Sequence, residues 1–296
     1  MPKKVKHKLI NYETGEVVAD YNISESDGLK IVSNKTSKAH VKRKDTKDLL
    51  VKYGDYIHLR YIYQTPIFQE LVKEVGHTKA NTHIIRLMKL ASLLTWNNTL
   101  YDSNRHRVKK SSLGKIWGIS NKTEIKGTYD ILTKYNYIYM EGDYIMINKE
   151  VISKGTIEAE KDSTYTRIFV ATIQELYDNS DKKKQKQIAH LFKILPYIHF
   201  EYNILCWNPT EIDTEKIELM TWKDLASICG VSPNNVKKLK QDLSLKINNQ
   251  YVIGEFKHSP TAKLPKIVVN PALYYAGSDI DKLTGVIKLF EAGNSK

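Results

Sequence analysis

Residues 232–241 carry polar side chains whose types and spacing suit the reading of base pairs. Their amides can form paired hydrogen bonds with adenine in the DNA major groove, and their lysines reach guanine or a phosphate. These side chains can contact the same DNA groove only if they lie together on one helix. The polar residues of the stretch are Ser232, Asn234, Asn235, Lys237, Lys238 and Gln241.

The local sequence predicts such a helix. Ser232 can cap its start, and Pro233 suits the first helical position. The apolar residues Val236, Leu239 and Leu243 recur at helical spacing and predict a buried stripe. The polar residues then lie on the opposite face, toward solvent or a partner. A helix with an ordinary solvated face is the alternative for the same pattern.

A second predicted helix precedes this one. Thr221 can cap it with Asp224 three residues later, and Gly230 is the residue type that ends a helix in a left-handed turn. Helix, glycine turn and helix form the helix-turn-helix pattern. Residues 249–256 and 264–271 then predict two strands, which together make a winged helix. The wing would present Lys257, His258, Lys263 and Lys266 to phosphates or to the minor groove.

The same order of segments occurs earlier in the chain. Lys89 aligns with Lys193, and QEL occurs in both places. We infer a tandem duplication, with a first half at residues 56–155 and a second half at residues 163–277. The matched segments are 69–71 with 174–176, 87–101 with 191–205, 117–132 with 229–243, and 145–155 with 267–277.

The first half predicts the same motif with a different charge pattern. Residues 111–118 and 122–135 predict the two helices, and Glu141-Gly142-Asp143 predicts a tight, acidic wing tip that would repel phosphate. Glu124 and Asp130 add acid to the second helix. We expect this half either to bind DNA more loosely or to serve in dimer contacts. Its candidate DNA-binding residues are Asn121, Lys122, Thr123 and Lys126, with Arg105, Arg107, Lys109 and Lys110 from the preceding basic run.

The predicted fold is therefore mainly α with small β-hairpins, an α+β class built from two tandem winged helix-turn-helix domains. The other segments are a basic N-terminal part with a short hairpin (1–55), a linker (156–162) and a C-terminal helix or tail (278–296). The basic stretch 30–52 is either an arm that follows a DNA backbone or a solvated tail.

Charge and composition favour a nucleic-acid partner. The chain has 296 residues, a net charge of +13 and a pI near 9.3, and such a field attracts polyanions. Two cysteines cannot build a disulfide framework or a four-ligand zinc site, and they fit a reducing cytoplasm. No signal peptide and no apolar run of about 18 residues is present, so we expect no membrane span.

Sequence signatures of enzymes are missing. The chain contains no phosphate-binding GxxxxGK[ST] loop, no HExxH and no His-x-His pair. We therefore expect neither catalysis nor a cofactor or metal.

Several of these motifs together resemble a known family. The YETGEVV opening (12–18), the GIS turn of the first half, GVSPNNVKKLKQDL and the VVNPALYYAG ending are similar to those of winged-helix replication initiator (Rep) proteins of Firmicute plasmids and phages, the RepL-like and related proteins. The resemblance implies a non-enzymatic protein that binds an origin and recruits replication proteins. Lys149-Glu150 stands where the first half would read Pro-Ala, which departs from this pattern.

The sequence thus predicts a cytoplasmic protein that binds specific double-stranded DNA, as a monomer or a homodimer. Replication initiation is the first hypothesis. A transcriptional regulator that uses the same DNA contacts, and a winged-helix module that binds proteins, are the alternatives.

Overall fold

The chain divides into two compact units, Met1–Lys44 and Asp45–Lys296. The structure, a computed structural model, describes residues 5–10, 17–23, 54–62, 67–155, 163–256, 265–275 and 284–292. The predicted linker and all of the basic stretch 30–52 lie outside these residues. In the first unit, strands β1 (Val5–Ile10) and β2 (Val17–Ile23) pair antiparallel.

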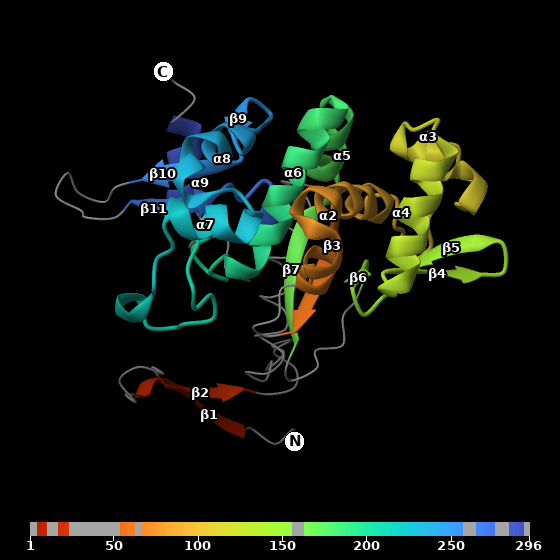
Figure 1. Cartoon of the computed structure of the whole chain (residues 1–296). Helices are drawn as coiled ribbons and strands as arrows, with labels where there is room; N and C mark the ends of the chain where they lie inside the picture. Colours follow the sequence, from red (N-terminus) through yellow and green to blue (C-terminus); the bar gives the residue numbers. More distant parts are fainter. Residues whose placement is uncertain are drawn as a thin grey trace. The chain divides into compact units, whose positions relative to one another are not determined.

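In the second unit, the two halves present their elements in nearly the same order (Figure 1). The first half contains β3 (Tyr56–Ile62), α2 (Gln69–Ala91), η2 (Lys110–Ser112), α3 (Leu113–Trp117), α4 (Lys122–Lys134), β4 (Ile138–Glu141), β5 (Tyr144–Ile147) and β6 (Ile152–Ser153). The second half begins with β7 (Ser163–Phe169), α5 (Val170–Asp178), α6 (Lys182–Ile194), η3 (Leu195–Tyr197), η4 (Thr214–Lys216), α7 (Trp222–Cys229), η5 (Pro233–Asn235) and α8 (Val236–Asp242). It continues with β8 (Lys246–Ile247), β9 (Gln250–Tyr251), β10 (Ile253–Phe256), β11 (Lys266–Val269) and β12 (Tyr274–Tyr275), and α9 (Thr284–Ala292) follows.

A four-stranded antiparallel sheet joins the halves. Its order is β12-β7-β3-β6, so the first strand of each half pairs with the first strand of the other. Tyr56 lies opposite Phe169 at one end of the β3–β7 pair, and Ile62 lies opposite Ser163 at the other. Figure 1 shows these two strands side by side beneath the helices. The small antiparallel sheets and the helices around them confirm the α+β class.

Both halves contribute side chains to one continuous hydrophobic core. Ile57, Leu87 and Leu132 of the first half belong to the same buried cluster as Leu191 and Leu239 of the second. All five are fully buried. Burial of one such side chain contributes roughly 1.5–3 kcal/mol relative to exposure, so this shared cluster holds the halves together.

Local sequence fixes the ends of the helices. Thr221 and Asp224 form a reciprocal capping box at the start of α7, as predicted, and the Asn121 side chain caps α4. Gly118 and Gly230 end α3 and α7 with φ of +64° and +73°, a left-handed conformation that favours glycine. The helix, turn and helix expected from each half are therefore present.

The single strand predicted over 249–256 is divided into two strands, β9 and β10, which pair with different partners. Asn248 and Asn249 both have positive φ and form a two-residue turn, which pairs β9 back onto β8. Only the segment after Val252 pairs with β11, as strand β10. The second half therefore has a small extra hairpin ahead of the β10–β11 pair, and the first half goes directly from α4 to β4.

Equivalent hydrogen bonds recur at aligned positions. Trp117 Nε1 donates to the Arg86 carbonyl, and Cys229 Sγ lies 4.0 Å from the His190 carbonyl in the second half. Gly76 kinks α2 near the point where the second half breaks into α5 and α6. These matches give residue-level correspondences between the halves.

Candidate nucleic-acid interface

The predicted reading face is formed by η5 and α8. Leu239 and Leu243 point into the core and are buried, which turns the other side of the helix outward. Residues three or four positions apart share a helix face, so residues 237, 238 and 241 of α8 lie together, and η5 presents its polar residues directly before them. The six exposed polar residues of this face are Ser232, Asn234, Asn235, Lys237, Lys238 and Gln241.

The lysines of this segment differ in whether an acid compensates them. Lys240 Nζ lies 2.7 Å from Glu255 Oε2 and 4.9 Å from the centre of the Trp222 ring. Lys237 and Lys238 have no carboxylate within 4 Å among the described residues. The outward face therefore carries two lysines without a direct ion pair beside its amides, of which Lys238 interacts with Asp242 at longer range, whereas Lys240 is held by Glu255 on β10.

Only part of the predicted second wing is described. Phe256 pairs with Lys266 where β10 and β11 meet the wing loop, so Lys266 lies at the base of the wing. Lys257, His258 and Lys263 lie outside the described residues.

In the first half, α4 uses some of its predicted contact residues internally. The Asn121 side chain accepts hydrogen bonds from the backbone of Thr123 and Glu124, at 3.0 Å and 3.2 Å, so its oxygen holds the helix start. Lys126 pairs with Asp130 at 3.2 Å. Lys122 and Thr123 remain exposed. Fewer free polar groups therefore face outward here than on α8.

One of the two acids on α4, Glu124, pairs with a buried cation. Glu124 forms an ion pair with Arg86, which is buried and also donates to the Thr128 hydroxyl at 2.5 Å. The hydrogen bond from Arg86 is the main cause that lowers the pKa of Glu124. Glu124 therefore compensates a buried cation and opposes DNA less than its position in the sequence suggests.

The basic run before α3 lies against the acidic wing tip. Arg107 Nη2 is 3.3 Å from Glu141 Oε2, and Lys109 Nζ is 3.4 Å from Asp143 Oδ2. The Arg107 guanidinium also stacks 4.0 Å from the centre of the Tyr144 ring. Two of the four predicted phosphate-binding cations are thus occupied by the two wing acids.

The other two cations of the run have different surroundings. Lys110 Nζ lies 3.7 Å from the centre of the Tyr129 ring, and Arg105 is exposed. A polar cleft of 510 Å³ opens beside Arg105, Arg107 and Lys109. The first half therefore has a basic surface whose charge its own wing partly cancels.

We expect the double substitution Glu141→Gln and Asp143→Asn to strengthen DNA binding by the first half. It removes the two acids that hold Arg107 and Lys109, so both cations can reach phosphates. Because each phosphate contact adds about 0.9 to the salt slope, the slope should steepen by up to ~2. Titrations of a duplex at several salt concentrations measure this change.

The matched control for this experiment is Asp213→Asn with Glu215→Gln on η4. It makes the same change in net charge, and Asp213 is likewise paired with a lysine, Lys216, at 3.1 Å. An equal gain in both double variants would attribute the effect to overall charge and contradict a specific role for the wing acids.

Other classes of site find little support in the described residues. No group of three or more His, Cys, Asp and Glu side chains there could hold a metal ion. Both cysteines are free and buried. Each helix in the described ranges is too short or too polar to cross a membrane.

Comparison with protein-family models gave no match, and neither did comparison with curated proteins or with solved structures. A proposal for function therefore rests on the residues of this chain.

Proposed function

We propose that the protein binds specific double-stranded DNA through two winged-helix units, with the second half as the base reader. The observation that carries this proposal is the outward face of η5 and α8. It joins three amide side chains to Lys237 and Lys238, neither of which forms an ion pair within 4 Å in the described part of the chain. Such a face suits the major groove, where amides select adenine and lysines select guanine or phosphate.

The first half has a supporting role in this proposal. Its basic run and α4 contact phosphates weakly, because the wing acids compete for Arg107 and Lys109. Two linked units raise the effective concentration of the second contact once the first has formed. The net charge of +13 favours association with any duplex, and the second half selects the site.

The proposal is tested by selecting duplexes from a random pool and titrating the winning site. Asn235→Ala should weaken binding to that site by about 1–3 kcal/mol and relax the preference at one base pair. Lys238→Ala should weaken specific and bulk DNA alike and lower the salt slope by about 1. Titrations of both variants on selected and bulk DNA separate these effects.

Lys240→Ala is the matched control, because Lys240 lies on the same helix and is held by Glu255. It should leave the salt slope nearly unchanged. If no sequence is enriched and Asn235→Ala and Lys238→Ala bind DNA like the wild type, the reading face binds a protein instead.

We propose replication initiation at a plasmid or phage origin, with recruitment of replication proteins, as the consequence of DNA binding. The support is the motif resemblance together with the paired units. An origin-bearing plasmid should replicate in cells that make the wild type and fail with Asn235→Ala. A plasmid that replicates without the protein, and a selected site that lies in a promoter, would favour transcriptional regulation instead.

A further inference from the structure

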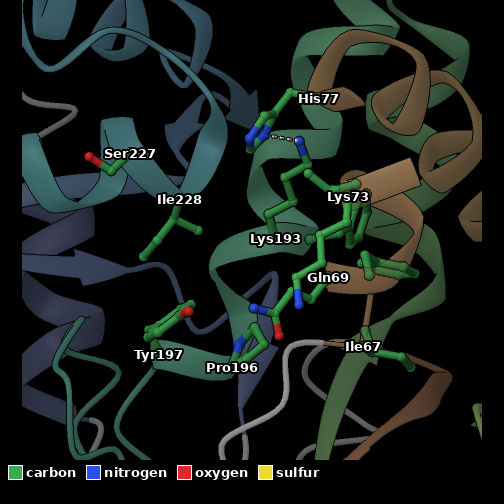
Figure 2. Close-up of a pocket in the computed structure, with 12 residues that line it drawn as sticks. Ile67, Gln69, Lys73, His77, Lys193, Pro196, Tyr197, Ser227 and Ile228 are labelled. Atoms are coloured by element: carbon green, nitrogen blue, oxygen red, sulfur yellow. Dashed lines mark hydrogen bonds between the residues drawn. The ribbon is translucent and has the colours of Figure 1, made fainter. Parts of the chain in front are cut away.

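A pocket of 370 Å³ lies where α2 of the first half meets α6, η3 and α7 of the second half (Figure 2). Its volume falls at the lower end of the range for small-ligand sites. Its polar lining residues are Lys73, His77, Lys193, Gln69 and Ser227, and most of the others are apolar. The main apolar residues are Ile67, Phe68, Val72, Phe192, Tyr197 and Ile228.

Lys193 is the unusual member of this lining. Its side chain is 5% exposed, and its Nζ lies 3.3 Å from Nδ1 of His77. Burial and the nearby lysine both lower the pKa of His77, so that ring is neutral and does not compensate the charge. Among the described residues no carboxylate lies within 4 Å of Lys193 Nζ. A buried charge without a partner is unfavourable unless a ligand supplies one.

The aligned lysine of the first half, Lys89, has a charge partner within the chain. Lys89 aligns with Lys193, and its Nζ lies 2.6 Å from Asp178 Oδ1 and 5.1 Å from the centre of the Tyr177 ring. The carboxylate and the ring thus both come from the opposite half. This contact is complete within the chain.

The pocket lies at the position in the other half that corresponds to this contact, but the carboxylate and the aromatic ring are absent there. When the two QEL segments are aligned, Lys73 corresponds to Asp178 and Val72 corresponds to Tyr177. In this alignment a second cation replaces the acid, and a smaller side chain replaces the ring; both residues line the pocket. Both changes leave room and positive charge beside Lys193.

We propose that this pocket binds a small free carboxylate with an apolar body. The carboxylate pairs with Lys193 and Lys73, and the apolar body occupies the space that Tyr177 fills in the equivalent contact. A charged head on a buried lysine fixes the ligand's orientation, while the lining excludes water from its body.

The pocket also contacts the helix-turn-helix of the second half. Ser227 and Ile228 of α7 line it, and the His77 ring packs directly on Gly230 of the turn, where an added Cβ would lie 2.0 Å from His77 Cγ. A ligand held between α2 and α7 therefore stabilises one placement of that turn. We expect it to change DNA affinity, a consequence that rests on the proposed function.

The binding site is tested by calorimetry on the full chain with octanoate, and with octanol and acetate as comparators. Octanol has a similar body without charge, and acetate has the charge without the body. Octanoate should bind once per chain and more tightly than either. Lys193→Met should weaken octanoate binding about tenfold or more, since 1.4 kcal/mol corresponds to a factor of ten.

Val72→Tyr provides a second variant that keeps every charge. It restores the residue type of the equivalent position and should fill the pocket, so octanoate should no longer bind. Lys89→Met is the control, because Lys89 is already paired with Asp178. Octanoate that binds no better than octanol, or that binds both pocket variants like the wild type, would overturn the site.

The link to DNA is a separate measurement. Octanoate should change the affinity of the wild type for its selected duplex several-fold and leave that of Val72→Tyr unchanged. By reciprocity, the duplex should change octanoate affinity by the same factor. Equal DNA affinity with and without octanoate would overturn the coupling alone, because calorimetry decides the site without DNA.

Discussion

Gly230→Ala is expected to lower the free energy of unfolding by about 2–4 kcal/mol, because it combines backbone strain with overpacking. Gly230 has a φ of +73°, which L-residues adopt at a cost of about 1 kcal/mol. Its new Cβ would also lie 2.0 Å from Cγ of His77, so the His77 ring or the turn would have to shift. Urea titration of the full chain measures the loss as a shift in midpoint at constant m-value.

Gly118→Ala supplies the matched control in the other half. Gly118 ends α3 with a φ of +64°, and nothing lies within 4 Å of an added Cβ. It should lose only the backbone contribution, about 1 kcal/mol. The difference between the two variants therefore measures the contact with His77, and it should vanish in a His77→Ala background. Equal losses in both variants would show that the turn and α2 are not in close contact.

Lys193→Met is expected to stabilise the protein at pH 7 by about 2–3 kcal/mol and to lose this advantage as the pH rises. Burial lowers the pKa of Lys193 from 10.5 to about 8. Between those values the unfolded chain binds more protons than the folded chain, so raising the pH stabilises the wild type. The variant lacks this contribution. Urea titrations at several values from pH 7 to pH 10.5 measure the difference.

The groups near Lys193 do not mask the effect. Burial raises the pKa of Cys229 on α7 to about 12 and lowers that of His77 on α2, so both are neutral across the window. Tyrosines that titrate at high pH do so in both proteins, so the difference between the two curves isolates Lys193. Lys89→Met should instead destabilise at every pH, because it leaves Asp178 unpaired. A constant difference between wild type and Lys193→Met would contradict the buried charge.

The parts of the fold that local interactions determine are the ones that the sequence predicts. The capping box of Thr221 and Asp224 locates the start of α7, whereas Ser232 and Pro233, predicted to open the next helix, form the short 3₁₀ turn η5, and α8 begins only at Val236. The sequence did not predict the β3–β7 pairing, because the rest of the first half separates these two strands along the chain. The division of residues 249–256 into two strands was not predicted, because an apolar run does not show that Asn248 and Asn249 form a turn inside it.

In the candidate interface, too, the sequence predicts only the features that local interactions determine. A buried stripe forces the opposite face of α8 outward, so its exposed amides and lysines follow from periodicity. Ion pairs such as Arg107 with Glu141 depend on where a hairpin folds back, and periodicity carries no such information. The pocket around Lys193 has a faint signal in the sequence, because the alignment that pairs Lys89 with Lys193 also sets Asp178 against Lys73.

The β3–β7 pairing also determines when the protein can finish folding on the ribosome. Partner residues in this pair lie more than 100 positions apart. At typical synthesis rates of about 5–20 residues per second, β3 waits roughly 5–20 s for its neighbour to emerge. During that interval the nascent first half presents an open strand edge, which is a template for pairing with other chains. Newly made protein is therefore most exposed to aggregation, and most dependent on chaperones, just before β7 emerges from the exit tunnel.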